Sequence, residues 1–388
     1  MAKTVRVVRK RSSLKRRRAL IGKKSKVVKR SGSRRRVKLM KGGGPKNILL
    51  IIDPQNDFTP AYEGGPNPDG GSLKVPGAIE DYYKIIQLVK SGSYDEIHIS
   101  LDTHQELHIG NPGFWNVVNE RGGIISGAVP TPFSTLKLTD DGKIEGTPLM
   151  GGDKSYYIPK NTDLTGYVNA YLKFYAESGY DDVPNKHNVS AWIWANHCLE
   201  NTEGHKIYKP LQDALDSVKD KVTYHIKGQN RLTEMFSIFS AEIPVNTVID
   251  KMNNASDDEK EYIRRHQYAG EKTESTGKSA GSYDKVIELL NLDTSLNTEF
   301  IKQLIGEPEN PNTLHVCGEA KTHCVKSSLV DLLENCGLSD EQKTSNIILI
   351  EDASSPIGGE DAGSAAIALL TEKKCGIKKF DEVYSKSA

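Results

Sequence analysis

The chain has 388 residues and a formal net charge of +1, enough length for one large domain or two average ones. No apolar run reaches the roughly 20 residues of a membrane-spanning helix, and the N-terminus lacks the apolar segment of a signal peptide. We therefore expect neither a membrane protein nor a secreted one. The cysteines are scattered and odd in number, which fits a reducing, cytoplasmic or nuclear compartment; they are Cys198, Cys317, Cys324, Cys336 and Cys375.

The small net charge hides an uneven distribution. Residues 1–46 contain 20 Lys and Arg and no Asp or Glu, which leaves 32 basic and 51 acidic residues in the rest. Such a segment repels itself and cannot bury a core, so a disordered basic tail is predicted. Its expected partner is nucleic acid, in a nucleus, a nucleoid or a packaged particle. Binding would lack sequence preference, because the tail has no aromatic residue to stack on bases. The alternatives are a transit peptide, a nuclear localisation signal, and a tail that folds back on the acidic body.

From residue 47 onward, apolar strand candidates alternate with helix-like segments. Near-continuous apolar runs at 48–52 and 347–350 are typical of a parallel sheet covered on both faces. Residues 47–388 are therefore predicted to form one α/β domain, with insertions at about 116–190 and 243–282 that lack the alternation. Strands are predicted over 47–53, 96–102, 191–196, 222–227, 313–318 and 346–351, and helices over 78–91, 209–219, 283–292, 298–305, 323–335 and 360–373.

Residues that can carry chemistry end or follow five of the predicted strands. In chain order they are Asp53, Asp102, His197, Lys227 and Cys324. Ligands of an open parallel sheet bind beyond the carboxyl ends of its strands, so we expect these side chains to meet at one rim.

Three of the candidates have the chemistry of metal ligands. Asp102, His104 and His197 offer the oxygen and imidazole donors that hold Zn²⁺, Fe²⁺ or Mn²⁺, and one divalent ion, most simply zinc, is expected. Asp102 and His104 are two residues apart, so in an extended segment their side chains point the same way. His108 is either a further ligand or a residue that supports one, and a solvated loop is the alternative for the Asp-x-His pair alone.

Asp53, Lys227 and Cys324 form a second chemical set. A carboxylate can take a thiol proton, and an ammonium can stabilise the resulting thiolate. Cys324 is expected in the first turn of a helix, where free N–H groups and the helix dipole can lower a thiol pKa. A structural ion pair between Asp53 and Lys227, and an ordinary buried cysteine, are the alternatives.

The motifs around these residues resemble the isochorismatase-like cysteine hydrolases, and most of all the nicotinamidases. The motifs are Ile52-Asp-Pro-Gln-Asn-Asp-Phe58, Asp102-Thr-His104, Trp194-Ala-Asn-His197-Cys198, Lys227-Gly228 and Ala320-Lys-Thr-His-Cys324-Val. The resemblance implies a three-layer α/β/α sandwich with a six-stranded parallel sheet. It also implies a metal that holds the pyridine nitrogen of the substrate.

The resemblance further implies roles for individual residues. Asp53, Lys227 and Cys324 would form a catalytic triad. The N–H groups of Ala320 and Cys324 would form the oxyanion hole, with a cis peptide bond before Ala320. Phe58 and Trp194 would enclose the substrate ring, and the metal ligands would be Asp102, His104 and His197.

The hypothesis is therefore a metal-dependent amidohydrolase that converts nicotinamide to nicotinate and ammonia through a thioester on Cys324. Thr103, Asn196 and Thr322 depart from the family pattern. The alternatives are a hydrolase of the same fold that acts on isochorismate or a carbamoyl amide, and a catalytically idle module with a nucleic-acid-binding tail. The insertions leave homo-oligomer formation open.

Overall fold

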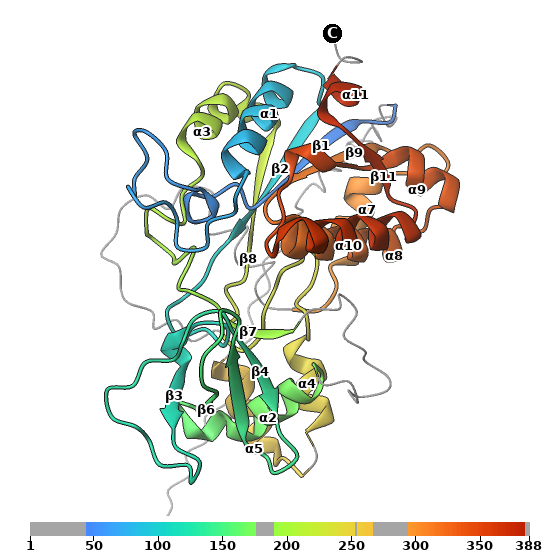
Figure 1. Ribbon diagram of the computed structural model, residues 1–388. Helices are drawn as coiled ribbons and strands as arrows, with labels where there is room; N and C mark the ends of the chain where they lie inside the picture. The colour runs from blue at the N-terminus through green and yellow to red at the C-terminus, as the bar shows by residue number, and fades with distance from the viewer. Residues whose placement is uncertain (1–43, 176–189, 253, 267–293, 385–388) are drawn as a thin grey trace, which may run out of the picture. The chain divides into compact units, whose positions relative to one another are not determined.

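The computed structural model describes residues 44–175, 190–252, 254–266 and 294–384. Its centre is a six-stranded sheet in the order β11-β10-β9-β1-β2-β8, and every neighbouring pair is parallel (Figure 1). The predicted sheet type is confirmed. The strands are β1 (Asn47–Ile52), β2 (Glu96–Asp102), β8 (Val222–Lys227), β9 (Thr313–Gly318), β10 (Ile347–Ile350) and β11 (Gly376–Lys378).

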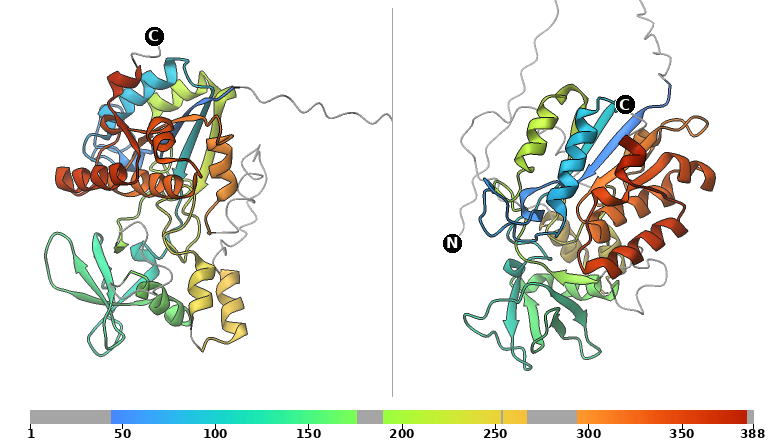
Figure 2. Two further views of the ribbon diagram at one scale, coloured as in Figure 1. Left: turned by 90° about the vertical axis from the view of Figure 1, so that its right-hand side faces the viewer. Right: turned by 45° about the horizontal axis from the view of Figure 1, so that its top comes forward.

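Helices cover both faces of this sheet, which explains its near-continuous apolar strands. In β1, the side chains of Ile48 to Ile52 are at most 1% exposed. The helices α1 (Ala78–Lys90) and α3 (Lys209–Asp216) pack on each other, and α8 (Lys326–Asn335) packs on α10 (Gly359–Glu372) (Figures 1 and 2). The remaining helices around this sheet are α7 (Thr298–Ile305), α9 (Asp340–Asn346) and α11 (Phe380–Tyr384).

The order of the strands creates a crevice between β1 and β9. The chain runs from β1 to β2 and β8 in one direction, then returns across the sheet to β9 and continues to β10 and β11 in the other. Right-handed crossovers place the two sets of helices on opposite faces, so the covering layers part at this point. The crevice lies at the carboxyl ends of β1 and β9, where Asp53 and Cys324 follow.

One strand prediction needs correction, and one strand was not predicted. The segment predicted as a strand of the central sheet at residues 191–196 forms β7 (Ala191–Ile193), which belongs to a second, antiparallel sheet. The place of the sixth parallel strand is taken by β11 instead. Apolar periodicity indicates a strand but not its partner, and β11 has only three residues and no periodic pattern to recognise.

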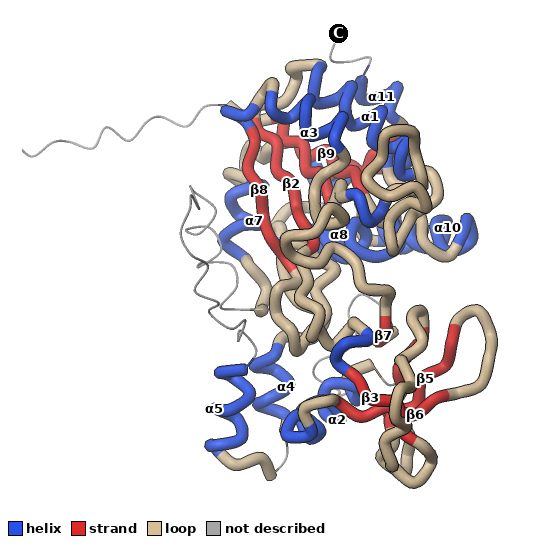
Figure 3. The backbone as a smooth tube through the Cα atoms, turned by 90° about the vertical axis from the view of Figure 1, so that its left-hand side faces the viewer, coloured by secondary structure: helices blue, strands red, loops and turns tan. Residues whose placement is uncertain are grey.

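The second sheet belongs to a lobe with its own hydrophobic core, which we call the second lobe. Its strands have the order β3-β6-β5-β4-β7, and the helix α2 packs against β4, β6 and α4. Figure 3 shows the strands β3, β5, β6 and β7 of this lobe with the helices α2, α4 and α5. Trp115, Tyr157, Tyr167 and Phe174 are among its buried side chains. The further elements are β3 (Trp115–Val118), β4 (Ser134–Leu138), β5 (Ile144–Pro148), β6 (Ser155–Pro159), α2 (Thr165–Lys173), α4 (Val245–Lys251) and α5 (Asp257–His266).

The second lobe holds the segment that follows β8. The Tyr167 hydroxyl donates to Leu232 O (2.8 Å), and the Glu234 N–H donates to the Tyr171 hydroxyl (3.0 Å). The described parts of both predicted insertions therefore contribute to one structure beside the carboxyl ends of the parallel strands. The predicted helix at 283–292 and residues 1–43 of the predicted tail lie outside the described residues. Among the described helices, none is long and apolar enough to cross a membrane.

Candidate active site

Asp53, Lys227 and Cys324 meet at the carboxyl ends of β1, β8 and β9. The Lys227 Nζ lies 3.0 Å from Asp53 Oδ2 and 3.6 Å from Cys324 Sγ. The Cys324 thiol is also within hydrogen-bonding reach of the Asp53 carboxylate. All three side chains are buried, so these charges act on each other without water between them.

Asp53 is held by the neighbouring strand β2. The Asp53 N–H donates to Ser100 Oγ (3.0 Å), and the Ser100 hydroxyl donates to Asp53 Oδ1 (2.6 Å). Burial raises the pKa of Asp53, against the positive charge of Lys227. The backbone of Asp53 has a φ of 45°, in the left-handed region that non-glycine residues rarely adopt.

The resting thiol differs from the expectation. Cys324 lies in a π-helical turn, Lys321–Val325, which precedes α8. Burial raises the pKa of Cys324 well above its usual range, although the charge of Lys227 opposes this. The prediction that a helix terminus lowers the pKa of Cys324 is therefore wrong for the resting site, because desolvation has the larger effect on this pKa. A neutral thiol beside a carboxylate needs proton transfer to become a nucleophile.

A backbone donor points to an oxyanion site next to Cys324. The peptide bond between Glu319 and Ala320 is cis, as the resemblance implies. The Ala320 N–H is buried, and within the described segments it donates to no acceptor. Ala320 and Cys324 line the same cavity. A buried N–H without an internal partner is rare, and it suits a ligand oxygen.

Asp102, His104 and His197 converge as the sequence predicts. The Nε2 atoms of His104 and His197 lie 2.9 and 3.3 Å from Asp102 Oδ2. Each Nδ1 faces a carbonyl oxygen, Gly228 O (3.1 Å) and Ala195 O (2.8 Å). A carbonyl can only accept, so both Nδ1 atoms carry the hydrogen, and both Nε2 atoms face the Asp102 carboxylate, where a metal ion can take the place of a proton. This orientation and donor chemistry fit a divalent transition metal.

His108 does not fit the role of a further ligand. It lies close to His104 and Glu234, but both of its ring nitrogens are engaged. Its Nδ1 accepts from the Gly110 N–H (3.1 Å), and its Nε2 donates to Thr233 O (3.0 Å). Burial holds the pKa of His108 well below its usual range, so the ring is neutral. Its ring packs on His104 with a centroid distance of 4.4 Å, and it therefore supports a ligand rather than acting as one.

Aromatic side chains enclose a small cavity between the triad and the metal ligands. Phe58 packs against His197 with ring centroids 5.9 Å apart, and Trp194 packs against His323 at 5.4 Å. The cavity offers about 20 Å³ to the centres of water molecules, enough for only one or two. The cavity is lined by Phe58, Leu73, Asp102, Trp194, His197, Glu234, Phe236, Ala320, His323, Cys324 and Ile357.

Comparison with known proteins finds likeness among solved structures only. No protein-family model and no curated protein matches the chain. The nicotinamidase/pyrazinamidase of Acinetobacter baumanii is 16% identical over 87% of this chain and 98% of its own, with a TM-score of 0.46. The yeast nicotinamidase Pnc1p, bound to the inhibitor nicotinaldehyde, is 15% identical over 86% and 99%, with a TM-score of 0.44. An isochorismatase-like hydrolase from Alkaliphilus metalliredigens is 11% identical over 88% and 99%, with a TM-score of 0.35.

The six-stranded parallel sheet and the polar residues at its strand ends match what the resemblance implies. The fold is an α/β fold built on a six-stranded parallel sheet. The cavity also contains residues to which the sequence assigned no role. Glu234 and Phe236 reach the cavity from the segment after β8, and His323 comes from the turn before Cys324. Burial raises the pKa of Glu234 and lowers that of His323 to about 3. The aromatic residue in the polar run after Lys227, and the histidine beside Cys324, were the available signals.

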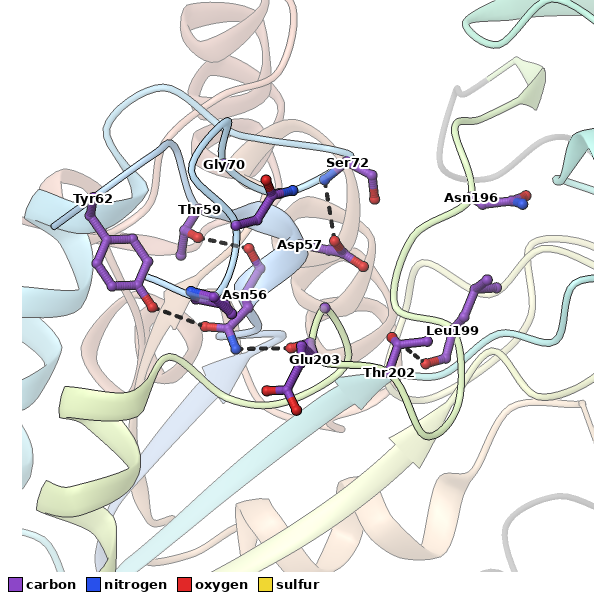
Figure 4. Close-up of a pocket in the computed structure, with 14 residues that line it drawn as sticks. Asn56, Asp57, Thr59, Tyr62, Gly70, Ser72, Asn196, Leu199, Thr202 and Glu203 are labelled. Atoms are coloured by element: carbon purple, nitrogen blue, oxygen red, sulfur yellow. Dashed lines mark hydrogen bonds between the residues drawn. The ribbon is translucent and has the colours of Figure 1, made fainter. Parts of the chain in front are cut away.

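A second, open pocket adjoins the strand ends of the six-stranded sheet (Figure 4). Its volume is about 390 Å³, and amide, hydroxyl and carboxylate groups line most of it. Asp57 lies in its wall and joins two loops. Asp57 Oδ1 accepts from the Ser72 N–H (3.2 Å), and Oδ2 accepts from the Cys198 N–H (2.7 Å). Asp57, to which the sequence assigned no role, therefore braces the loop that carries His197.

Proposed function

We propose that the chain is a metal-dependent cysteine amidohydrolase that converts nicotinamide to nicotinate and ammonia. The observation that carries the proposal is the position of Lys227. Its Nζ lies 3.0 Å from Asp53 Oδ2, 3.0 Å from Asp102 Oδ1 and 3.6 Å from Cys324 Sγ. One ammonium group thus contacts the base, the nucleophile and a candidate metal ligand. A structural ion pair would not need a thiol at this place.

The chemistry begins with proton transfer. The Cys324 thiol gives its proton to Asp53, and Lys227 stabilises the thiolate by charge. Burial lowers the pKa of Lys227, whereas the carboxylates of Asp102 and Asp53 raise it. The carboxylates have the larger combined effect, so the pKa of Lys227 lies well above its usual range. Lys227 therefore stays charged throughout and is an electrostatic partner rather than a proton donor.

The thiolate then attacks the amide carbon, and the negative charge develops on the carbonyl oxygen. The Ala320 and Cys324 N–H groups are the donors for that oxygen. Asp53 returns the proton to the leaving nitrogen, and ammonia departs as the thioester forms. Asp53 next takes a proton from a water molecule, which attacks the thioester carbon. Nicotinate leaves, and the Cys324 sulfur recovers a proton.

Asp102, His104 and His197 would hold the metal ion, zinc being the simplest choice for this donor set. Such an ion supplies a Lewis-acidic anchor for the pyridine nitrogen. Phe58 and Trp194 orient the ring between the metal ligands and the thiol, and the apolar walls exclude water other than the attacking molecule.

The nucleophile is tested by ammonia release from nicotinamide. We expect Cys324→Ala in the full-length protein to lower kcat by at least about a thousandfold, because no other group on the rim can form the thioester. Cys336→Ala is the matched control, since Cys336 is a buried free cysteine at the end of α8. Ammonia release by Cys324→Ala at the wild-type rate would contradict the mechanism.

The metal is tested by its content in the purified protein. We expect about one transition-metal ion per chain, and loss of both metal and ammonia release in His104→Ala and His197→Ala. Removal of the metal with a chelator should stop turnover, and adding it back should restore it. Full turnover by metal-free protein would refute the anchoring role. A metal-loaded protein that leaves nicotinamide untouched would favour isochorismate or a carbamoyl amide as substrate.

A further inference from the structure

Two buried carboxyl groups lie beneath the turn that carries Ala320, and the mechanism above does not use them. Asp81 belongs to α1 and is 4% exposed, while Glu319 directly follows β9 and is fully buried. Their carboxyl groups lie within hydrogen-bonding distance of each other. Glu319 directly precedes Ala320, so the candidate oxyanion donor, the Ala320 N–H, belongs to the peptide bond that joins the two residues.

The hydrogen-bond partners of this pair are incomplete. The Ser355 N–H donates to Glu319 Oε2 (3.3 Å), and the Ser355 hydroxyl bonds to Asp81. Asp81 Oδ2 and Glu319 Oε1 receive no hydrogen bond from any donor in the described segments. Two ionised carboxylates in contact would repel each other strongly away from water. One shared proton removes the repulsion and makes one of the two oxygens a donor.

The surroundings place that proton on Glu319. Burial, and then the charge of Asp81, raise the pKa of Glu319 well above its usual range. Burial also raises the pKa of Asp81, but hydrogen bonds from Ser355 and Glu319 oppose this. The Glu319 carboxyl group is therefore the donor, and the Asp81 carboxylate is the acceptor.

Other charged and titratable groups face the pair without neutralising it. The Lys84 ammonium of α1 lies 3.1 Å from Asp352 Oδ2 instead. The charge of Lys321, in the turn that carries Ala320, lowers the pKa of Asp81 and of Glu319 only as a minor effect. Tyr82 of α1 and Cys317 of β9 are buried and neutral, since burial raises the pKa of each well above its usual range. In the part of the chain that is described, no cation forms an ion pair with either carboxyl group.

The two carboxyl groups hold one side of the turn that carries Ala320 in place. The Glu319 N–H donates to Ile52 O (2.8 Å), and the Glu319 side chain reaches α1 and Ser355. On the other side of Ala320, the Lys321 N–H donates to Ser355 O (2.8 Å). The backbone before the oxyanion donor is thus fixed to the end of β1, the backbone after it is fixed to Ser355, and the Glu319 side chain connects the turn to α1.

We propose that a single proton shared by Glu319 and Asp81 fixes the turn that presents the Ala320 N–H, which makes Glu319 a positioning residue for the hydrolysis proposed above. Loss of the proton sets two negative charges against each other under the turn and moves the donor away from the carbonyl oxygen. The proposal rests on the proposed function for its catalytic part, whereas the shared proton itself does not depend on the substrate.

The catalytic part is tested with the full-length protein by kcat and KM for nicotinamide between about pH 5 and about pH 10. We expect Glu319→Ala to lower kcat at least about tenfold and to leave KM within about threefold, because the donor acts mainly in the transition state. Glu319→Gln keeps a neutral group that donates to Asp81 and accepts from Ser355. It should restore most of kcat and abolish the alkaline fall that Glu319 ionisation causes in the wild type.

Glu309→Gln, which removes an exposed carboxylate, is the matched control and should show the wild-type profile. Full kcat in Glu319→Ala would overturn the proposal. An unchanged alkaline fall in Glu319→Gln would overturn it as well. If Glu319→Ala does not fold, the profile of Glu319→Gln decides.

The shared proton is tested without any substrate, by chemical unfolding as a function of pH. The folded protein holds the Glu319 proton more tightly than the unfolded chain, whose glutamate has the ordinary pKa of 4.5. The wild type therefore loses stability as the pH rises above that value, and Glu319→Gln, which has no such proton, should lose less. The stability of Glu319→Gln relative to the wild type should thus increase with pH.

A relative stability that is constant across the pH range would overturn the shared proton. This measurement separates the two proposals. A protein that does not hydrolyse nicotinamide but shows the pH-dependent difference would refute the proposed function and support the carboxyl pair.

Discussion

Lys227 joins the two chemical groups of the site, which the sequence had treated as separate. Its ammonium lies 3.0 Å from one carboxylate of the triad and 3.0 Å from one of the metal group, Asp53 and Asp102. It also donates to Met235 O (3.0 Å). Removing this side chain would leave two buried carboxylates without their cation, and losses of about 3–5 kcal/mol are usual in such cases. A variant at Lys227 therefore tests stability as much as catalysis, and Asp53 gives a cleaner probe of the chemistry.

The base can be tuned through its neighbour Ser100. The proposed mechanism requires an ionised Asp53, so kcat/KM should fall as the pH drops through the Asp53 pKa, which burial raises above 3.8. The Ser100 hydroxyl stabilises the carboxylate from 2.6 Å. We expect Ser100→Ala to move the acidic limb of kcat/KM to higher pH by about one unit, since a hydrogen bond to a charged group contributes about 1.5–3 kcal/mol.

The measurement is the pH profile of kcat/KM for nicotinamide, with Ser327→Ala as control. Ser327 is equally buried, and its hydroxyl has no partner in the described part of the chain. An acidic limb at the same pH in Ser100→Ala and the wild type would mean that another group sets it.

At the scale of elements, the sequence predicted the strand ends of the site better than its walls. Asp53, Asp102, Lys227 and Cys324 each end or follow a strand whose apolar run is local, so position along the chain was enough to place them at one rim. Glu234, in contrast, depends on a contact with Tyr171 of the second lobe, formed across 63 residues of sequence. Local patterns carry no signal for such a contact, and the same limit explains why β7 was assigned to the wrong sheet.

The end of β8 is shaped by a glycine that the metal group requires. Gly228 has a φ of 80°, and a Cβ at this place would lie 2.7 Å from Asp102 Oδ1 and 3.0 Å from His104 Cε1. We expect Gly228→Ala to displace the two ligands and to lower the affinity for the metal by about 10–100-fold, as changes next to ligands do. The measurement is a metal titration of the apoprotein.

Gly92→Ala is the matched control for backbone strain. Gly92 has a φ of 73°, but a Cβ there would meet no atom within 4 Å. Both substitutions place a Cβ on backbone with a similar positive φ, so they should cost a similar conformational free energy. Only Gly228→Ala should lower the affinity for the metal. Equal affinities in the two variants would show that the ligands tolerate the extra methyl group.

At the scale of the whole molecule, the charge of residues 1–46 predicts binding to nucleic acid independently of the hydrolase site. We expect the full-length protein to retain DNA and RNA, with affinity falling roughly 10³-fold or more between about 50 and about 200 mM salt, because many phosphate counterions are displaced. A variant that begins at Lys46 should lose this binding and keep its turnover of nicotinamide. The measurement is retention of both nucleic acids across a salt series.

Equal retention by the full-length protein and the shortened variant, or none by either, would end the hypothesis of a nucleic-acid-binding tail. Loss of nicotinamide turnover in the shortened variant would instead connect the tail to the catalytic domain.

The position of β1 in the sheet has a consequence during protein synthesis. β1 pairs with β2 on one side and with β9 on the other, and contacts along the β9 edge join residues 266 positions apart, such as Lys46 and Asn312. On the ribosome, β1, β2, β8 and most of the second lobe are synthesised before β9. The edge of β1 that pairs with β9 therefore stays unpaired until the chain is nearly complete. An unpaired apolar edge favours aggregation of nascent chains. Chains that stall before residue 313 should therefore depend on chaperones, and no nascent chain can be active before Cys324 has joined Asp53.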